Sequence, residues 1–242
     1  MFPAITHILY DLGGTLLYFD GDWDAIFREA TQAAGRAGAR FGLDPGRQSA
    51  LAERLAARLQ ANYDRREIDL VEQPAVRVFA GALADLGVRI DEAGALEAAL
   101  DAFYTVTQDA WIPLPRAERT LAHLRAVGFH QAVLSNAAHD ADVQALVDKA
   151  GLRPHLDFVL TSAAIGRRKP DPETFLRAAR EWGVEPGNVL MVGDTLAADI
   201  QGGRDAGMRA VWMRKYSGDA PGEIRADFAI ETLTDLPGLL KK

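Results

Sequence analysis

The stretch Ile8-Leu9-Tyr10-Asp11-Leu12-Gly13-Gly14-Thr15-Leu16 runs from apolar residues into a carboxylate at a glycine turn. A short apolar run that stops at turn residues is typical of a buried strand. In an open α/β sheet, ligands bind at the carboxyl ends of the strands. The stretch therefore predicts a first strand with Asp11 at its functional end.

From Ile112 onward, short apolar runs alternate with amphipathic stretches. The runs predict strands over His130–Leu134, Phe158–Thr161, Val189–Val192, Ala210–Met213 and Phe228–Ile230, and the stretches predict helices over Arg116–Val127, Ala141–Ala150, Pro172–Trp182 and Leu196–Ala206. Strands separated by helices of about 10–15 residues indicate a parallel sheet covered on both faces. Together with the run from Ile5 to Tyr10, they predict an α/β fold with a Rossmann-like, doubly wound sheet.

The region from Trp23 to Asp109 has a different pattern. It is rich in Ala, Leu, Arg and Glu, with apolar residues at helical spacing such as Leu51, Leu55 and Leu59. We therefore predict a core of residues 1–18 and 112–242, with an all-helical domain of residues 19–111 inserted after the first strand. The stretch 111–115 contains two prolines that disfavour helix, and it is predicted to be the return linker.

Composition narrows the range of partners. The net charge of −7 argues against a nucleic-acid partner, because that affinity depends on cationic groups that neutralise phosphates. No apolar run approaches the roughly 18 residues of a membrane span. The chain has no cysteine, which rules out disulfides and thiolate metal sites. These features predict a cytoplasmic protein that binds neither nucleic acid nor membrane; its oligomeric state stays open.

Polar residues follow several of the predicted strands. Ser135 and Asn136 come after the second, Asp194 comes after the run that ends at Val192, and Asp199 follows five residues later. Lys169 comes shortly before a predicted helix. Because the carboxyl ends of parallel strands meet at one edge of a sheet, these side chains are expected to lie together.

Taken in order, these residues resemble the four motifs of the haloacid dehalogenase (HAD) superfamily. The matching segments are Asp11 with Gly14-Thr15, Ser135-Asn136, Lys169-Pro170, and Gly193-Asp194 with Asp199. Each motif alone is weak, but four in sequence at predicted strand ends or helix starts are specific. The inserted domain is similar to the helical C1-type cap of this superfamily. The resemblance implies a hydrolase that acts on a small phosphorylated metabolite.

The resemblance also implies a nucleophile and a metal site. Asp11 would attack phosphorus and form an aspartyl-phosphate. Mg²⁺ would be held by Asp11, Asp194 and the backbone carbonyl of Gly13, since this metal prefers oxygen ligands. That carbonyl is present whatever side chain the residue carries.

The other motif residues have roles implied by the same resemblance. Ser135 and Asn136 would bind the substrate phosphate, together with Lys169. The Lys169 ammonium would also stabilise the transition state as a catalytic residue. Asp199 would orient Lys169 or a metal-bound water.

Gly13 departs from the pattern. Most phosphatases of the superfamily carry there a second Asp, which protonates the leaving group and later activates water. Such a group typically contributes about 10²–10⁴-fold in rate. The sequence thus predicts either a slow or atypical Mg²⁺-dependent phosphohydrolase or a catalytically impaired protein that binds or senses a metabolite. In a third hypothesis, Asp20, Asp22 or His139 replaces the missing acid.

Two other branches of the superfamily also lack that Asp. Haloacid dehalogenases typically carry an aromatic residue there and need no magnesium, so Gly13 and Asp194 both count against them. Phosphonoacetaldehyde hydrolases need a lysine in the cap to form a Schiff base. This chain has no lysine before Lys149, which argues against that chemistry.

Overall fold

The computed structural model describes residues 5–88, 94–219 and 222–240. The chain divides into two compact units. The first, here called the core unit, comprises Met1–Phe19 and Ile112–Lys242. The second, the helical unit, comprises Asp20–Trp111.

The core unit is built on a parallel sheet of six strands in the order β5-β4-β1-β6-β7-β8. The strands are β1 (His7–Tyr10), β4 (His130–Ser135), β5 (Phe158–Thr161), β6 (Val189–Gly193), β7 (Arg209–Met213) and β8 (Phe228–Ile230). The chain passes from β1 to β4 and β5 on one side, then returns to β6 on the other. The predicted α/β fold class is confirmed, and β1 and β6 flank the point where the strand order reverses.

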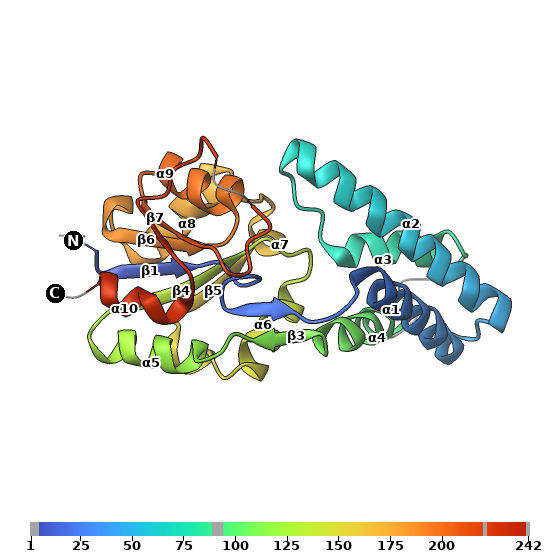
Figure 1. The fold of residues 1–242 in the computed structure, drawn as a ribbon. Helices are drawn as coiled ribbons and strands as arrows, with labels where there is room; N and C mark the ends of the chain where they lie inside the picture. Colours follow the sequence, from blue (N-terminus) through green and yellow to red (C-terminus); the bar gives the residue numbers. More distant parts are fainter. Residues whose placement is uncertain (1–4, 89–93, 220–221, 241–242) are drawn as a thin grey trace. The chain divides into compact units, whose positions relative to one another are not determined.

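Helices cover both faces of this sheet, with α8 and α9 on one face and α5 and α6 on the other (Figure 1). The core helices are α5 (Ala117–Ala126), α6 (Asp140–Lys149), α7 (Ser162–Ile165), α8 (Pro172–Trp182), α9 (Gly202–Asp205) and α10 (Leu236–Leu239), with the short turns η2 (Arg153–His155), η3 (Pro186–Asn188) and η5 (Leu233–Asp235). Phe175 of α8 packs in one buried cluster with Leu9 and Leu134 of the sheet.

The register of the strands aligns their polar ends. Tyr10 pairs with Val133 of β4 and with Val192 of β6. Asp11 therefore follows β1 at the level of Leu134 and Gly193, in the middle of the sheet. This alignment is the geometric basis of the site described below.

The segment predicted as a helix over 196–206 has two parts. The turn η4 (Leu196–Gln201) is a π-helix, and the short α-helix α9 follows it. π-Helical turns are rare and are frequently found at functional sites. Asp199 lies in this turn and is buried.

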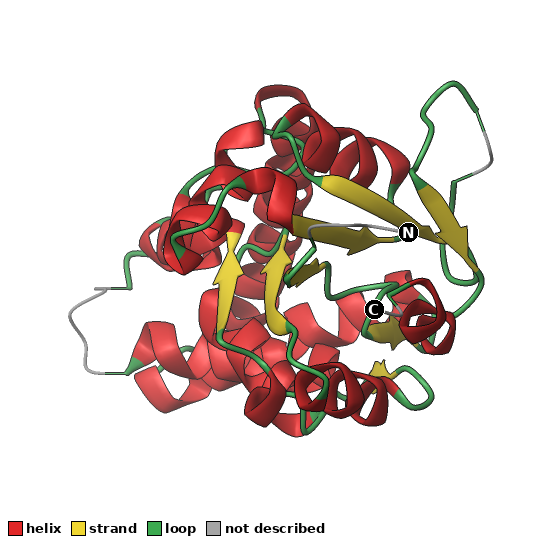
Figure 2. Cartoon of the chain, turned by 90° about the vertical axis from the view of Figure 1, so that its left-hand side faces the viewer, coloured by secondary structure: helices red, strands yellow, loops and turns green. Residues whose placement is uncertain are grey.

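The return linker contains a strand that sequence analysis missed. β3 (Trp111–Pro113) pairs with β2 (Leu17–Phe19) in a second, two-stranded sheet. Strands of three residues are too short to show a period, and their pairing joins segments far apart in the sequence. Figure 2 separates the strands, in yellow, from the helices, in red.

The described part of the helical unit consists of α1 (Trp23–Ala37), η1 (Gly38–Phe41), α2 (Pro45–Asp69), α3 (Ala75–Ala84) and α4 (Ala95–Gln108). The Phe103 ring lies edge-on to Phe27 and Phe79, with ring centroids 6.0 and 5.5 Å away. These contacts join α1, α3 and α4 around an aromatic centre. Among the residues that the structure describes, no helix combines the length and the apolar character needed to cross a bilayer.

Gly202 begins α9 against the loop that carries Lys169. A Cβ there would lie 2.8 Å from Pro170 Cα and 2.7 Å from Phe175 Cε2. Gly202→Ala is therefore expected to lower the free energy of unfolding by about 1–3 kcal/mol, because the clash outweighs the better helix propensity of alanine. Urea denaturation measures the change. Gly187→Ala is the control, since a Cβ at Gly187 meets nothing within 4 Å; equal losses in both variants would contradict this account.

Candidate active site

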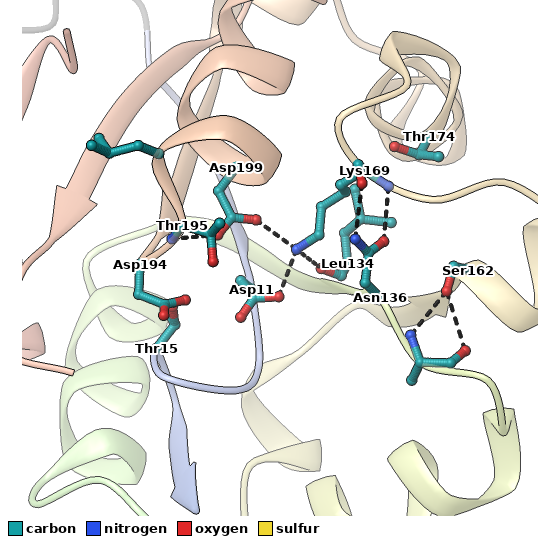
Figure 3. Close-up of polar contacts among 12 residues, drawn as sticks. Asp11, Thr15, Leu134, Asn136, Ser162, Lys169, Thr174, Asp194, Thr195 and Asp199 are labelled. Carbon is teal, nitrogen blue, oxygen red and sulfur yellow. Dashed lines mark hydrogen bonds and ion pairs between the residues drawn. The ribbon is translucent and has the colours of Figure 1, made fainter. Parts of the chain in front are cut away.

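Lys169 is the centre of a buried polar cluster at the carboxyl ends of β1, β4 and β6 (Figure 3). Its Nζ lies 2.5 Å from Asp11 Oδ1, 2.7 Å from Asp199 Oδ1 and 2.8 Å from the carbonyl oxygen of Leu134. An ammonium group has three hydrogens to donate, and three oxygens surround this one. The lysine is thus fixed against Asp11 in one geometry.

Asn136 holds the backbone of Lys169. Its side-chain Nδ2 donates to the Lys169 carbonyl at 2.9 Å, and its Oδ1 accepts from the Lys169 N–H at 2.8 Å. The next residue, Ala137, is held in a similar way, because the buried Ser162 hydroxyl accepts from its N–H and donates to its carbonyl. The loop after β4 therefore fixes the segment that carries the lysine.

Asp199 closes the cluster from the π-helical turn. Its Oδ2 accepts from the Thr195 N–H at 3.1 Å, and its Oδ1 faces Lys169. A Cβ on Gly193 would lie 2.4 Å from the Asp199 Cβ, Cγ and Oδ2. Only glycine at the end of β6 leaves room for this carboxylate.

Asp194 lies beside Asp11 and is held through its backbone. Its carbonyl accepts from Trp212 Nε1 at 2.9 Å and from Ser217 Oγ at 2.5 Å. The Thr15 hydroxyl lies 3.5 Å from Asp194 Oδ1. Sequence reasoning missed Ser217, because the loop after β7 has no periodic signal. It also missed Trp212, which lies in a predicted strand but belongs to no motif.

Asp11, Asp194 and Asp199 can each offer a carboxylate oxygen within 4.8 Å of the other two. Burial is the main cause that raises the pKa of Asp11 to about 6 and that of Asp194 to about 8, and the neighbouring carboxylates add to both shifts. Burial alone would lower the pKa of Lys169, but Asp11 and Asp199 outweigh it and raise that pKa above its ordinary value. One lysine thus faces three acids, and negative charge is in excess.

This donor set fits a hard divalent cation. Carboxylate oxygens are the ligands that Mg²⁺ prefers, and the surplus charge gives a cation a favourable site. Both Asp199 oxygens are engaged, by Lys169 and by the Thr195 N–H. Asp11 and Asp194 are therefore the carboxylates best able to bind a metal.

The remaining predicted residues lie in several places. Ser135 ends β4 with a buried side chain, and Gly13 forms a bridge with Leu17 in the turn after Asp11. His139 precedes α6 in the core unit. Asp20 and Asp22 belong to the helical unit, and the Asp22 side chain accepts from two backbone N–H groups at the start of α1.

A family model for haloacid dehalogenase-like hydrolases matches residues 5–207. Among curated proteins, the chain is 40% identical over 138 residues to a phosphoserine phosphatase of Thermus thermophilus, covering 57% of this chain and 53% of that one. It is 30% identical over 129 residues to a glyceraldehyde 3-phosphate phosphatase of Pyrococcus furiosus, covering 53% of each. The matched region thus spans about half the length of these relatives.

The same fold is found in solved structures. A 2-haloacid dehalogenase from Pseudomonas syringae pv. tomato DC3000 superposes with a TM-score of 0.68 at 28% identity, over 98% of both chains. An HAD phosphatase from Thermococcus onnurineus superposes with a TM-score of 0.64 at 22% identity, again over 98% of both chains. The fold is thus shared with enzymes described as phosphatases and as dehalogenases.

Gly14 sets the approach of Asp194 to the turn after β1. Its φ is +75°, and a Cβ would lie 2.4 Å from Asp194 Oδ2. Gly14→Ala is expected to lower the free energy of unfolding by about 2–4 kcal/mol, from backbone strain and the clash together. Gly128→Ala is the matched control, because Gly128 has a φ of +94° with nothing within 4 Å of a Cβ. Urea denaturation should show a clearly smaller loss in the control, and equal losses would contradict the clash.

The raised pKa values predict how stability depends on pH in a chelator. Folded Asp11 and Asp194 retain protons up to about pH 6 and about pH 8, whereas the unfolded chain releases them near pH 4. These groups therefore lower the free energy of unfolding as pH rises from about 4 to about 8. Asp194→Asn should raise the free energy of unfolding at pH 8 by roughly 1–3 kcal/mol and make its decline with rising pH less steep.

Denaturation in EDTA from pH 5 to 8 tests this prediction, with Asp101→Asn, an exposed carboxylate of α4, as the control. Added Mg²⁺ should stabilise the wild type and the control at pH 8 but have little effect on Asp194→Asn. The explanation is wrong if Asp194→Asn in EDTA is no more stable at pH 8 than the control.

Proposed function

Because the chain belongs to the haloacid dehalogenase-like hydrolases, we propose that it is a Mg²⁺-dependent phosphohydrolase of a small phosphorylated metabolite, slowed by glycine at position 13. The observation that carries the proposal is the contact of Lys169 Nζ with Asp11 at 2.5 Å inside a cluster of three carboxylates. The relatives described as phosphatases of phosphoserine and glyceraldehyde 3-phosphate support this class of substrate.

Asp11 and Asp194, with the Gly13 carbonyl, would hold Mg²⁺. When bound, the ion would neutralise charge on the phosphate, so that a carboxylate can approach a dianionic substrate. The Lys169 ammonium adds positive charge beside the attacking oxygen. Ser135, at the end of β4, would donate its hydroxyl to a phosphate oxygen.

The chemistry would proceed in two displacements on phosphorus. In the first, an Asp11 carboxylate oxygen forms a bond to phosphorus while the bond to the leaving oxygen breaks. The leaving oxygen takes its proton from water, since glycine has none to give. In the second, water attacks the aspartyl-phosphate, releases inorganic phosphate and restores the Asp11 carboxylate.

Asn136 would act mainly by positioning. Two hydrogen bonds to the Lys169 backbone occupy both polar atoms of its amide. We expect the loss of these bonds to displace the lysine rather than to remove a phosphate contact. The predicted role of Asn136 in substrate binding would then be limited to its remaining N–H.

A second candidate function is metabolite binding without turnover, and Gly13 is the observation that favours it. Without an acid, an alkyl phosphate has a poor leaving group, and without a base the aspartyl-phosphate is hydrolysed slowly. The helical unit would then be retained as a cap for binding. The two candidates differ in one measurable property, which is turnover of a substrate with a good leaving group.

Hydrolysis of p-nitrophenyl phosphate tests the proposal directly. We expect turnover with Mg²⁺, none with EDTA, and a loss on the order of 10³-fold or more in Asp11→Asn. Asp101→Asn should leave the rate unchanged. Release of chloride from 2-chloropropionate, assayed in parallel, tests dehalogenase chemistry. Equal rates in Asp11→Asn and wild type, or halide release without phosphatase activity, would contradict the proposal.

Gly13→Asp tests the explanation of slow turnover. Gly13 is not among the residues with positive φ, so its φ does not disfavour a side chain. With the missing group restored, kcat for an alkyl phosphate such as glycerol phosphate is expected to rise by about 10²–10⁴-fold, and much less for p-nitrophenyl phosphate. A folded Gly13→Asp protein that binds Mg²⁺ but shows the same alkyl rate as wild type would disprove the explanation.

A further inference from the structure

A cavity with a volume of about 170 Å³ lies in the core unit. It is lined by the segment before α5, the end of β7 and the residues after β8. Its floor is apolar, because Leu114, Met213 and Leu233 line it with buried side chains. An apolar cavity of about 150 Å³ can hold a benzene ring, so this one has room for a single small ring.

Two cationic residues, Arg116 and Lys215, also line this cavity. Throughout residues 5–88, 94–219 and 222–240, neither forms an ion pair, and Lys215 Nζ lies 5.3 Å from the centre of the Tyr216 ring. The acid nearest in sequence to the cavity-lining Thr232 is Glu231, and it pairs with Arg214. Asp235 is a second acid beside the cavity lining, and its Oδ2 accepts from the Thr232 N–H at 2.9 Å. Among the described residues, neither carboxylate is therefore paired with Arg116 or Lys215.

Arg116 adopts a backbone conformation that its side chain makes costly. Its φ is +64°, in the left-handed region that glycine occupies freely and arginine rarely does. Strain of this kind is frequently found at ligand sites. Glycine would adopt this backbone conformation at less cost than arginine. The position nevertheless carries a cation beside the cavity.

We propose that this cavity binds a small carboxylate with an apolar body, about the size of benzoate, at a site separate from the Asp11 cluster. The apolar floor would take the ring, and Arg116 and Lys215 would pair with the carboxylate. The hydroxyls of Thr232 and Thr234, which also line the cavity, bond to each other at 2.8 Å, and Thr232 Oγ1 donates to Asp235 Oδ2 at 3.4 Å. The carboxylate would therefore be held mainly by the two cations. An uncharged molecule of the same shape would gain only the apolar contact.

The site is adjacent to an element of the catalytic centre. Tyr216 lines the cavity, and the next residue, Ser217, donates to the Asp194 carbonyl at 2.5 Å. Tyr216 also stacks on Tyr18 of β2, with ring centroids 5.4 Å apart. A ligand in the cavity would thus contact the loop that holds Asp194, without touching the carboxylates themselves.

Calorimetric titration with sodium benzoate tests the proposal on the whole chain and needs no turnover. We expect a Kd of about 0.1–10 mM, as suits a ligand of this size. Arg116→Gln and Lys215→Gln should each weaken binding at least about fivefold, whereas Arg119→Gln, which changes an exposed cation of α5, should not. Benzamide, the uncharged analogue, should bind the wild type no more tightly than benzoate binds Arg116→Gln or Lys215→Gln.

Two further variants keep the test decisive. Arg116→Gly relieves the strained φ, so it should keep or raise the Tm while it weakens benzoate binding; a loss of binding then does not reflect unfolding. Asp194→Asn should leave benzoate affinity unchanged, because the two sites are separate. The proposal is overturned if benzoate does not bind the wild type, binds Arg116→Gln and Lys215→Gln as tightly as the wild type, or depends on Asp194 instead.

Discussion

The buried ammonium of Lys169 is the charge on which the rest of the site depends. A lysine removed from water is costly unless each of its hydrogens finds an acceptor and its charge finds a partner. Here Asp11 and the Leu134 carbonyl accept hydrogen bonds, and Asp199 adds an ion pair at 2.7 Å; the three partners come from separate segments of the chain. The parallel register that aligns the ends of β1 and β4 is what brings two of them together.

The same charge balance would allow the site to bind a divalent cation first and an anionic substrate afterwards. Lys169 neutralises part of the negative charge of the three carboxylates, and the remainder favours a divalent ion beside Asp11 and Asp194. With lysine and metal together, the centre would become attractive to a phosphate dianion. A change at Gly14 or Gly193 would disturb this balance indirectly, because each glycine leaves space for one of the carboxylates.

The sequence predicted those parts of the site that lie at the ends of regular elements. Asp11 and Asp194 follow apolar runs, and a parallel sheet places such residues at one edge whatever the details of packing. The hydrogen bonds of Asn136 to the Lys169 backbone could not be predicted, since they join a loop to a segment 33 residues away. The π-helical turn around Asp199 could not be predicted from the sequence either, because a shift in backbone hydrogen bonding does not alter the apolar pattern.

The most direct test of the account is the mass of the intact protein after acid quenching of its reaction with p-nitrophenyl phosphate and Mg²⁺. We predict that one phosphoryl group accumulates on the chain, that peptide mapping places it on Asp11, and that hydroxylamine removes it. Accumulation follows from Gly13, which leaves the second displacement without a base. Turnover with the phosphoryl group on another residue, or unaffected by Asp11→Asn, would contradict the account.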